Sequence, residues 1–184
     1  MRNKLNPLII LVSLLSYCAT AAKAEEFSWG IPQEGVKIGV VQRPWSTHNG
    51  VITICIARTT NYMNDLVLPS DFQQSFECTL KGPNTLPVEK TAAGKRYGAK
   101  LQTNMPRSKR ISGELKDNFG NDLMQLAFFE IDKTFIITDS GRYELEIRAR
   151  LLKESTNGLV PVAFYPIKVN LDLVANKREL VTHP

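Results

Sequence analysis

The sequence predicts an all-β fold, arranged as an antiparallel β-sandwich. The clearest sign is the segment 142–151, in which charged and apolar residues alternate at every position. A period of two residues is typical of a strand with one buried and one solvated face. Several shorter apolar segments of strand length recur along the chain, separated by Gly, Pro and Asn, which mark turns. About seven short strands joined in this way favour a sandwich with Greek-key-like connections.

The first 24 residues have the layout of a secretory signal peptide. Two basic residues, Arg2 and Lys4, precede an apolar run from Leu8 to Tyr17. A membrane-spanning helix needs roughly 20 apolar residues, so this run is too short to remain as an anchor. No later apolar run is longer, and we therefore expect no transmembrane segment in the mature chain.

Small residues at Ala22 and Ala24 suit a signal peptidase, and we expect cleavage between Ala24 and Glu25. The exported chain would then be periplasmic or extracellular. The alternative is a lipoprotein signal ending at Cys18, which the large side chain of Tyr17 disfavours. The expected organisation is a signal peptide at 1–24, one β-sandwich domain at 25–176 and a frayed polar tail at 177–184.

Loss of the signal peptide changes the charge balance of the protein. It removes three basic side chains and no acidic one, which leaves 20 Lys and Arg against 18 Asp and Glu. The basic character of the full chain therefore does not indicate nucleic-acid binding.

The first strands are expected at 36–41, 51–59 and 72–80, with Asn49-Gly50 as the turn before the second. The segment 81–120 is poor in apolar residues and rich in Gly, Pro, Asn, Lys and Thr. We expect it to form loops with one or two short strands.

The second half of the chain has one ambiguous segment. The apolar residues of 122–131 fit either a helix or a fully buried strand, and we favour a strand because the surrounding pattern is all β. A short strand is expected at 135–138. The strand at 142–151 and the segment 159–173 form a hairpin, with Asn157-Gly158 as its turn. Pro161 and Pro166 lack a backbone donor, so the first part of 159–173 should be an edge or contain a break.

Two cysteines, Cys55 and Cys78, remain after Cys18 leaves with the signal peptide. An even pair in an oxidising compartment favours a disulfide, worth roughly 3 kcal/mol. The alternative is two buried free thiols. Cys78 shares a strand face with Phe76 and Leu80, whereas Cys55 faces away from the isoleucines beside it, so both alternatives stay open.

The motif Asp139-Ser140-Gly141-Arg142-Tyr143 resembles the D-x-G-x-Y turn of immunoglobulin-like domains. In that family the tyrosine hydroxyl bonds back to the backbone and fixes a corner of the sandwich. The resemblance implies an immunoglobulin-like antiparallel β-sandwich, with Asp139, Gly141 and Tyr143 in structural roles. This chain departs from the antibody pattern because Leu145 stands where the second core cysteine would follow, and 72–80 contains no tryptophan.

A looser resemblance involves Trp29-Gly30-Ile31-Pro32 and the following Gly35–Gly39. These residues are similar to the start of uncharacterised exported bacterial sandwich proteins. The resemblance implies an exported, non-catalytic domain and nothing about a ligand.

Residues that carry familiar chemistry are scattered. The histidines His48 and His183 are far apart, and the chain has neither C-x-x-C nor G-x-S-x-G. We therefore expect no metal, no cofactor and no enzymatic activity. The basic cluster at 107–110 fits a solvated loop or a contact with an anionic surface.

Two aromatic residues, Trp45 and Tyr62, lie in predicted loops and are candidate ligand contacts. Each could instead fold back over the end of the core. We expect an exported, non-enzymatic domain that binds or supports another envelope or extracellular protein. The alternative is a carbohydrate-binding module that uses loop aromatics such as Trp45.

Overall fold

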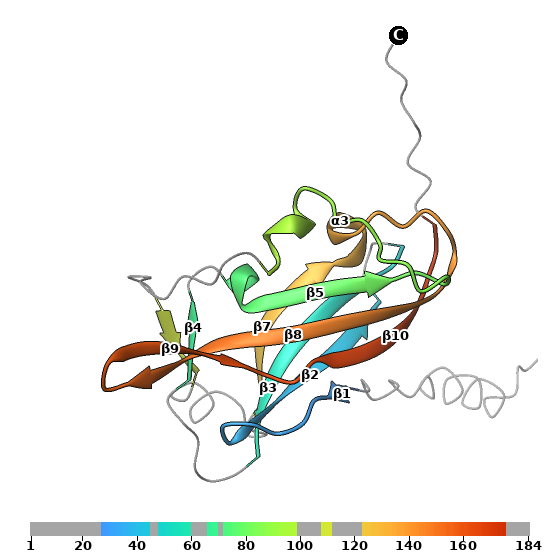
Figure 1. Ribbon diagram of the computed structural model, residues 1–184. Coiled ribbons are helices and arrows are strands. Elements are labelled where there is room, and N and C mark those ends of the chain that lie inside the picture. The colour runs from blue at the N-terminus through green and yellow to red at the C-terminus, as the bar shows by residue number, and fades with distance from the viewer. Residues whose placement is uncertain are drawn as a thin grey trace, which may run out of the picture.

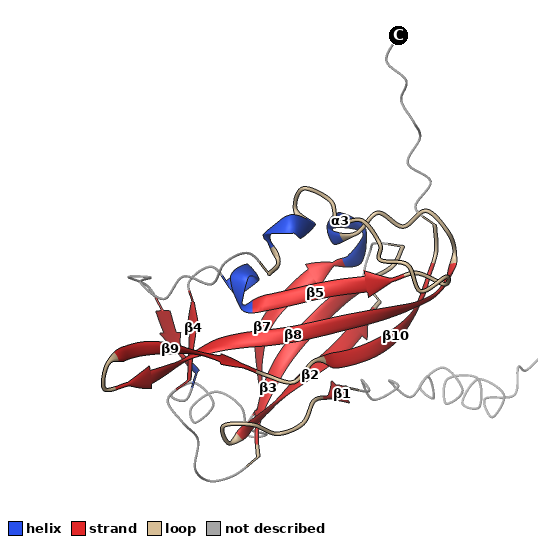
Figure 2. Cartoon of the chain, viewed as in Figure 1, coloured by secondary structure: helices blue, strands red, loops and turns tan. Residues whose placement is uncertain are grey.

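The computed structural model describes residues 27–44, 48–59, 66–69, 72–98, 108–111 and 123–175. Two antiparallel β-sheets pack face to face in this part of the chain, as Figures 1 and 2 show. The described helical elements are single turns: η1 (Phe72–Ser75), η2 (Gly94–Arg96) and α3 (Ile131–Thr134). Within these described ranges, none of the helices has the length and apolar character needed to cross a membrane. The predicted all-β antiparallel sandwich is confirmed.

The first sheet has four strands in the order β1-β2-β3-β7, all antiparallel. Their bounds are Ser28–Trp29, Val36–Arg43, Val51–Arg58 and Leu123–Glu130. Strands β2 and β3 form a hairpin, and Gly50 has a φ of 73° at its turn. Glycine adopts this conformation without steric cost, which confirms the turn predicted at Asn49-Gly50.

The second sheet is built around the long strand β8 (Gly141–Ser155), which contacts neighbours along both edges. On one edge lie β10 (Ile167–Leu173) and β9 (Gly158–Ala163). On the other edge lie β5 (Phe76–Lys81) and β4 (Leu66–Pro69), and β6 (Ser108–Arg110) pairs with β4. The chain crosses between the sheets after β3, before β7 and again before β8, which matches the expected Greek-key-like connections.

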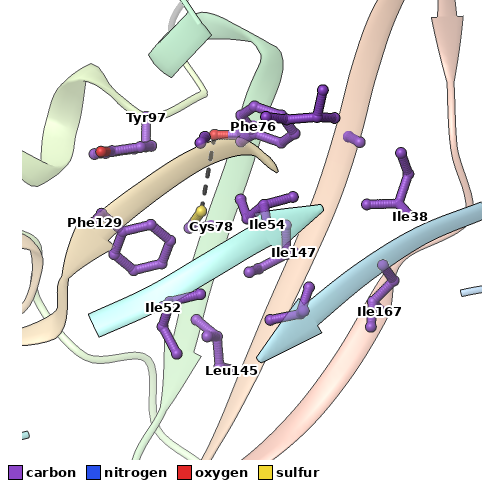
Figure 3. Packing of buried hydrophobic residues seen from close by; sticks show 14 of the residues in the cluster. Ile38, Ile52, Ile54, Phe76, Cys78, Tyr97, Phe129, Leu145, Ile147 and Ile167 are labelled. Carbon is purple, nitrogen blue, oxygen red and sulfur yellow. Dashed lines mark hydrogen bonds between the residues drawn. The ribbon is translucent and has the colours of Figure 1, made fainter. Parts of the chain in front are cut away.

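The core fills the space between the two sheets. Strand β3 contributes Ile52, Ile54 and Ile56, all fully buried, and β8 contributes Leu145 and Ile147 from the facing sheet. Figure 3 shows the side chains of Ile54 and Ile147 meeting there. Burying side chains of this size contributes about 1.5–3 kcal/mol each, so this contact provides much of the force that holds the sheets together.

A β-bulge explains the ambiguous pattern at 122–131. The pairing of β3 with β7 shifts between Ile54 and Cys55, so that β7 holds one extra residue. Leu126 and Ala127 are both buried as a result, although they are consecutive, while Phe128 points outward. The bulge interrupts the two-residue period and produces a spacing that also fits a helix. The predicted strand is confirmed, and α3 follows directly after its last residue, Glu130.

Several elements differ from the sequence prediction, among them the two-residue strand β1, which was not predicted. Phe72–Ser75 forms η1 and not the start of β5. The predicted strand at 135–138 is wrong, because Phe135 makes only an isolated bridge to Lys90 and Ile136 N–H donates to the Glu89 carbonyl oxygen. Strand β4 was not predicted, since its four residues are too short to show a period.

The predicted hairpin of 142–151 with 159–173 is confirmed. The second segment is broken at residues 164–166 into β9 and β10, as Pro161 and Pro166 indicated. The Phe164 N–H donates to the Ala149 carbonyl oxygen at 2.8 Å. In an antiparallel pair, only every second residue directs its backbone N–H toward the partner strand. Phe164 is such a residue, so Pro161, three residues earlier, has its backbone nitrogen on the side away from β8. Proline here costs no ladder hydrogen bond and blocks pairing along the outer edge of β9.

Buried Asn49 joins three elements at one end of the sandwich. Its side-chain Nδ2 donates to Asp132 Oδ1 at 2.6 Å and to the Val174 carbonyl oxygen at 2.9 Å. Its Oδ1 accepts from the Val174 N–H at 2.7 Å. This one side chain therefore ties the β2–β3 turn to α3 and to the end of β10, and its polar atoms are satisfied although they are buried.

Candidate interaction surfaces

Several residues singled out from the sequence lie outside the described ranges. These are the expected cleavage residues Ala24 and Glu25 and the candidate ligand contacts Trp45 and Tyr62. His48 is described and exposed. Arg107 also lies outside the described residues, whereas the remainder of that basic cluster forms β6.

No disulfide joins the two cysteines, which lie on different sheets, Cys55 on β3 of the first and Cys78 on β5 of the second. Cys78 points into the core from β5 and lies close to Ile54 in Figure 3, where its Sγ contacts the Phe76 carbonyl oxygen at 3.9 Å. Cys55 lies on β3, on the face opposite to Ile54. Burial raises the pKa of the Cys78 thiol to about 12, so at neutral pH it is protonated and unreactive. The alternative of two buried free thiols is the one found in the structure.

The predicted corner is formed by a short hydrogen bond. Tyr143 lies near the start of β8 with its ring buried, and its hydroxyl donates to the Asp139 carbonyl oxygen at 2.6 Å. Gly141 has a φ of 156°. Burial first, and then the negative charge of Asp139, raise the pKa of Tyr143. The bond fixes the segment that enters β8 against the body of the sandwich.

A pocket of about 250 Å³ lies beside this corner. One wall is the loop 82–89 that follows β5, and the other is the segment 136–139 that precedes β8, with Tyr143 between them. Figure 1 shows both segments at the same end of the sandwich, the first in green and the second in orange. The hydrogen bond from Ile136 N–H to the Glu89 carbonyl oxygen, at 2.9 Å, joins the two walls.

An exposed apolar surface lies at β9 and in the connection to β10. No charged residue occurs between Glu154 and Lys168 in the sequence. Val160 is 46% exposed and Tyr165 is 58% exposed, and Pro161 and Pro166 are exposed beside them. We call residues 159–166 the apolar segment. Exposed apolar side chains therefore follow one another along this segment, with no charged residue among them.

The N-terminal loop extends the apolar segment. Gln33 Oε1 accepts from the Tyr165 N–H at 2.7 Å, and Gln33 Nε2 donates to the Ala163 carbonyl oxygen at 3.5 Å. Ile31, two residues before Gln33, is 62% exposed. Two stretches more than 120 residues apart therefore present apolar side chains in the same region.

The loop aromatics predicted from the sequence, Trp45 and Tyr62, do not belong to the apolar segment. Residues 158–163 form the strand β9, but none of them is fully buried, whereas a strand pattern predicts one buried face. The signal that could have revealed the apolar segment is the absence of charge between Glu154 and Lys168 combined with two prolines. Prolines keep such a stretch from packing as a central strand, so its apolar side chains remain outside.

The outer faces of the two sheets differ in chemistry. On β8, Glu144 and Glu146 pair with cations, among them Lys168 Nζ at 3.1 Å from Glu144 Oε1. On the first sheet the ring of Trp29 lies over Gly39, with Lys37 Nζ 4.3 Å from the ring centroid. The charged pairs make the outer face of the second sheet a solvated surface.

Among the described residues, no group of three or more His, Cys, Asp or Glu side chains is placed to hold a metal ion. No protein-family model matches the sequence, and neither a curated protein nor a solved structure is similar enough to match it.

Proposed function

We propose that the chain is an exported, non-enzymatic domain that binds another protein of the envelope or the extracellular space. The observation that carries this proposal is the exposed apolar segment at β9, with Ile31 beside it. Exposed aromatic and aliphatic side chains in one region are what protein interfaces use as buried anchors. Export is the expectation from residues 1–24.

We also propose that the sandwich is immunoglobulin-like. The order β2-β3-β7 in one sheet and β10-β8-β5 in the other supports this, because it follows strands A-B-E and G-F-C of that family. The hydrogen bond from Tyr143 to the Asp139 backbone supports it as well. Many such domains recognise proteins, although the fold alone does not assign a role.

Tyr165 is the anchor that we place at the centre of the interface. Its side chain is more than half exposed, whereas its backbone is held by the bond to Gln33. A rigid backbone reduces the entropy lost when the ring is buried by a partner. Because Tyr has a large apolar surface and few rotamers, it is among the residues most often found at binding hot spots.

Photo-cross-linking in the cells that export the protein tests the proposal. A benzophenone side chain in place of Tyr165 should give a covalent adduct with one defined protein, and the same partner should be captured from position 31. The matched control is a benzophenone at Asn170, which is exposed on β10 away from the apolar segment. Absence of an adduct at position 165, or equal capture from position 170, would contradict the proposed function.

A further inference from the structure

We infer that the pocket beside Tyr143 receives a lysine or arginine side chain of the partner protein. This inference rests on the proposed function, which it extends by naming a second contact and its chemistry. Four features of the pocket support it: its size, its rigid walls, its lining and its charge.

The volume of about 250 Å³ suits a single side chain. Sites for small molecules and cofactors measure roughly 300–1,000 Å³, so this pocket is smaller than the usual range. An inserted side chain from a protein needs no more space, because the rest of the partner stays outside.

The walls of the pocket are held by backbone hydrogen bonds. Gly82 N–H donates to the Leu86 carbonyl oxygen at 2.8 Å, and Thr85 N–H donates to the Gly82 carbonyl oxygen at 2.9 Å. Thr85 has a φ of 62°, a turn conformation that this bonded loop maintains. Together with the bond between Ile136 and Glu89, these contacts form the pocket before any ligand arrives, which lowers the cost of binding.

The lining combines apolar residues with two acidic residues. Leu86 is 68% exposed at the rim, and Val88 and Ile136 are half-buried lining residues. Glu89 and Asp139 are the charged lining residues, and the pocket has no lysine or arginine in its lining. Asp139 Oδ2 accepts a hydrogen bond from Thr138 Oγ1 at 3.0 Å, which leaves its other oxygen available.

This lining matches the chemistry of a basic side chain. The aliphatic stem of lysine or arginine packs against apolar surface while its cationic head remains near water and carboxylates. Charge-assisted hydrogen bonds to Glu89 and Asp139 would then fix the head group. Glu89 and Asp139 have no cation within ion-pair distance in the described part of the chain, so a partner need not displace one.

Amide chemical shifts of the exported chain provide the test, with N-acetyl-lysine methylamide as the probe and N-acetyl-norleucine methylamide as its uncharged counterpart. The lysine probe should give saturable shifts confined to 82–89 and 136–143, at least several-fold stronger than those from norleucine. Glu89→Gln together with Asp139→Asn should weaken binding at least fivefold. The matched variant Asp172→Asn, which removes an exposed carboxylate from β10, should leave it unchanged. Equal binding of both probes, or binding that survives the double substitution, would overturn the inference.

A second measurement links the pocket to the partner. The same double substitution, introduced into the chain with the cross-linker at position 165, should lower the yield of adduct several-fold. An unchanged yield would show that the partner does not use the pocket. Failure of the proposed function would give a different result. The adduct at position 165 would then be absent even from the chain with an unchanged pocket, whether or not the lysine probe binds.

Discussion

The Tyr143 hydroxyl makes one short hydrogen bond, to a carbonyl oxygen four residues earlier. Tyr143→Phe keeps the buried ring and leaves the Asp139 carbonyl without this donor. We expect a loss of about 1 kcal/mol or more in the free energy of unfolding, measured by urea denaturation. Tyr165→Phe is the matched control, because that side chain is mostly exposed, and it should change stability little. Identical denaturation curves for wild type and Tyr143→Phe would mean that the corner contributes nothing.

Cys78 makes the stability of the protein depend on pH in the alkaline range. Its ordinary pKa is 9.0, and burial raises it to about 12 in the folded protein. The folded state therefore holds its proton more tightly than the unfolded chain does. The resulting stabilisation is fully present below pH 9 and is lost as the pH rises from 9 towards 12.

Between pH 8 and pH 11, wild type should lose on the order of 2–3 kcal/mol more unfolding free energy than Cys78→Ala. Urea denaturation at both pH values measures this difference, and the comparison between variants removes the contribution of other titrating groups. Parallel pH profiles for the two proteins would contradict it. As a control, denatured protein that has not been reduced should show both Cys55 and Cys78 as free thiols.

The short helices η2 and α3 meet at a glycine. A Cβ at Gly94 would lie 2.0 Å from the Thr134 carbonyl oxygen, a backbone atom that cannot move without shifting α3. Gly94→Ala should therefore cost about 1–3 kcal/mol of stability, measured by urea denaturation. Gly82→Ala is the matched control, since its Cβ would have ordinary contacts at 3.6 Å. Equal effects of the two substitutions would be incompatible with the packing described.

At the scale of elements, a strand with a regular two-residue period could be predicted from the sequence, whereas an irregular strand was ambiguous. Strand β8 keeps one buried and one charged face for ten residues, and its pattern predicted it directly. Strand β7 breaks the period at Leu126-Ala127, where the bulge depends on pairing with β3 and is invisible in the local sequence. The apolar residues at 135–138 are buried by packing, but the segment has only one bridged residue and no ladder.

The candidate surfaces were harder to predict because both are assembled from distant segments. The motif that contains Asp139 and Tyr143 was visible in the sequence. The pocket is also lined by Glu89, which lies in the loop after β5, about 50 residues earlier in the chain. The exposed side chains at Ile31 and Tyr165 come together only through Gln33. No local pattern encodes such contacts, whereas the corner is encoded by five consecutive residues.

At the scale of the whole molecule, the loop 82–89 and strand β9 lie at opposite ends of β8 (Figure 1), and each carries one of the two surfaces. The pocket adjoins the start of β8, and β9 pairs with the final residues of that strand. One continuous strand therefore sets the separation between them. A partner that contacts both ends must extend along the sandwich, and changes at one end should leave the structure at the other intact.

The N-terminal residues 27–34 join the two sheets along one side of the sandwich. Trp29 pairs with Gly39 in the first sheet, and its ring covers that glycine. Toward the second sheet, Gln33 bonds to the Tyr165 backbone, and Lys153 Nζ lies 2.9 Å from Glu34 Oε2. These contacts add to those of Asn49, which joins the sheets at Val174, so this segment should matter for the whole domain.

A chain that begins at Gly35 should consequently be less stable than one that begins at Glu25. We expect a loss of roughly 3 kcal/mol or more, because the edge of β2 loses its partner and the covering ring of Trp29 is removed. The urea midpoint of unfolding measures the difference. Ile31→Ser in the longer chain is the control, since that side chain is 62% exposed and its replacement should change stability by less than about 0.5 kcal/mol. If both chains unfold at the same urea concentration, the core alone holds the sheets together and residues 27–34 serve binding rather than folding.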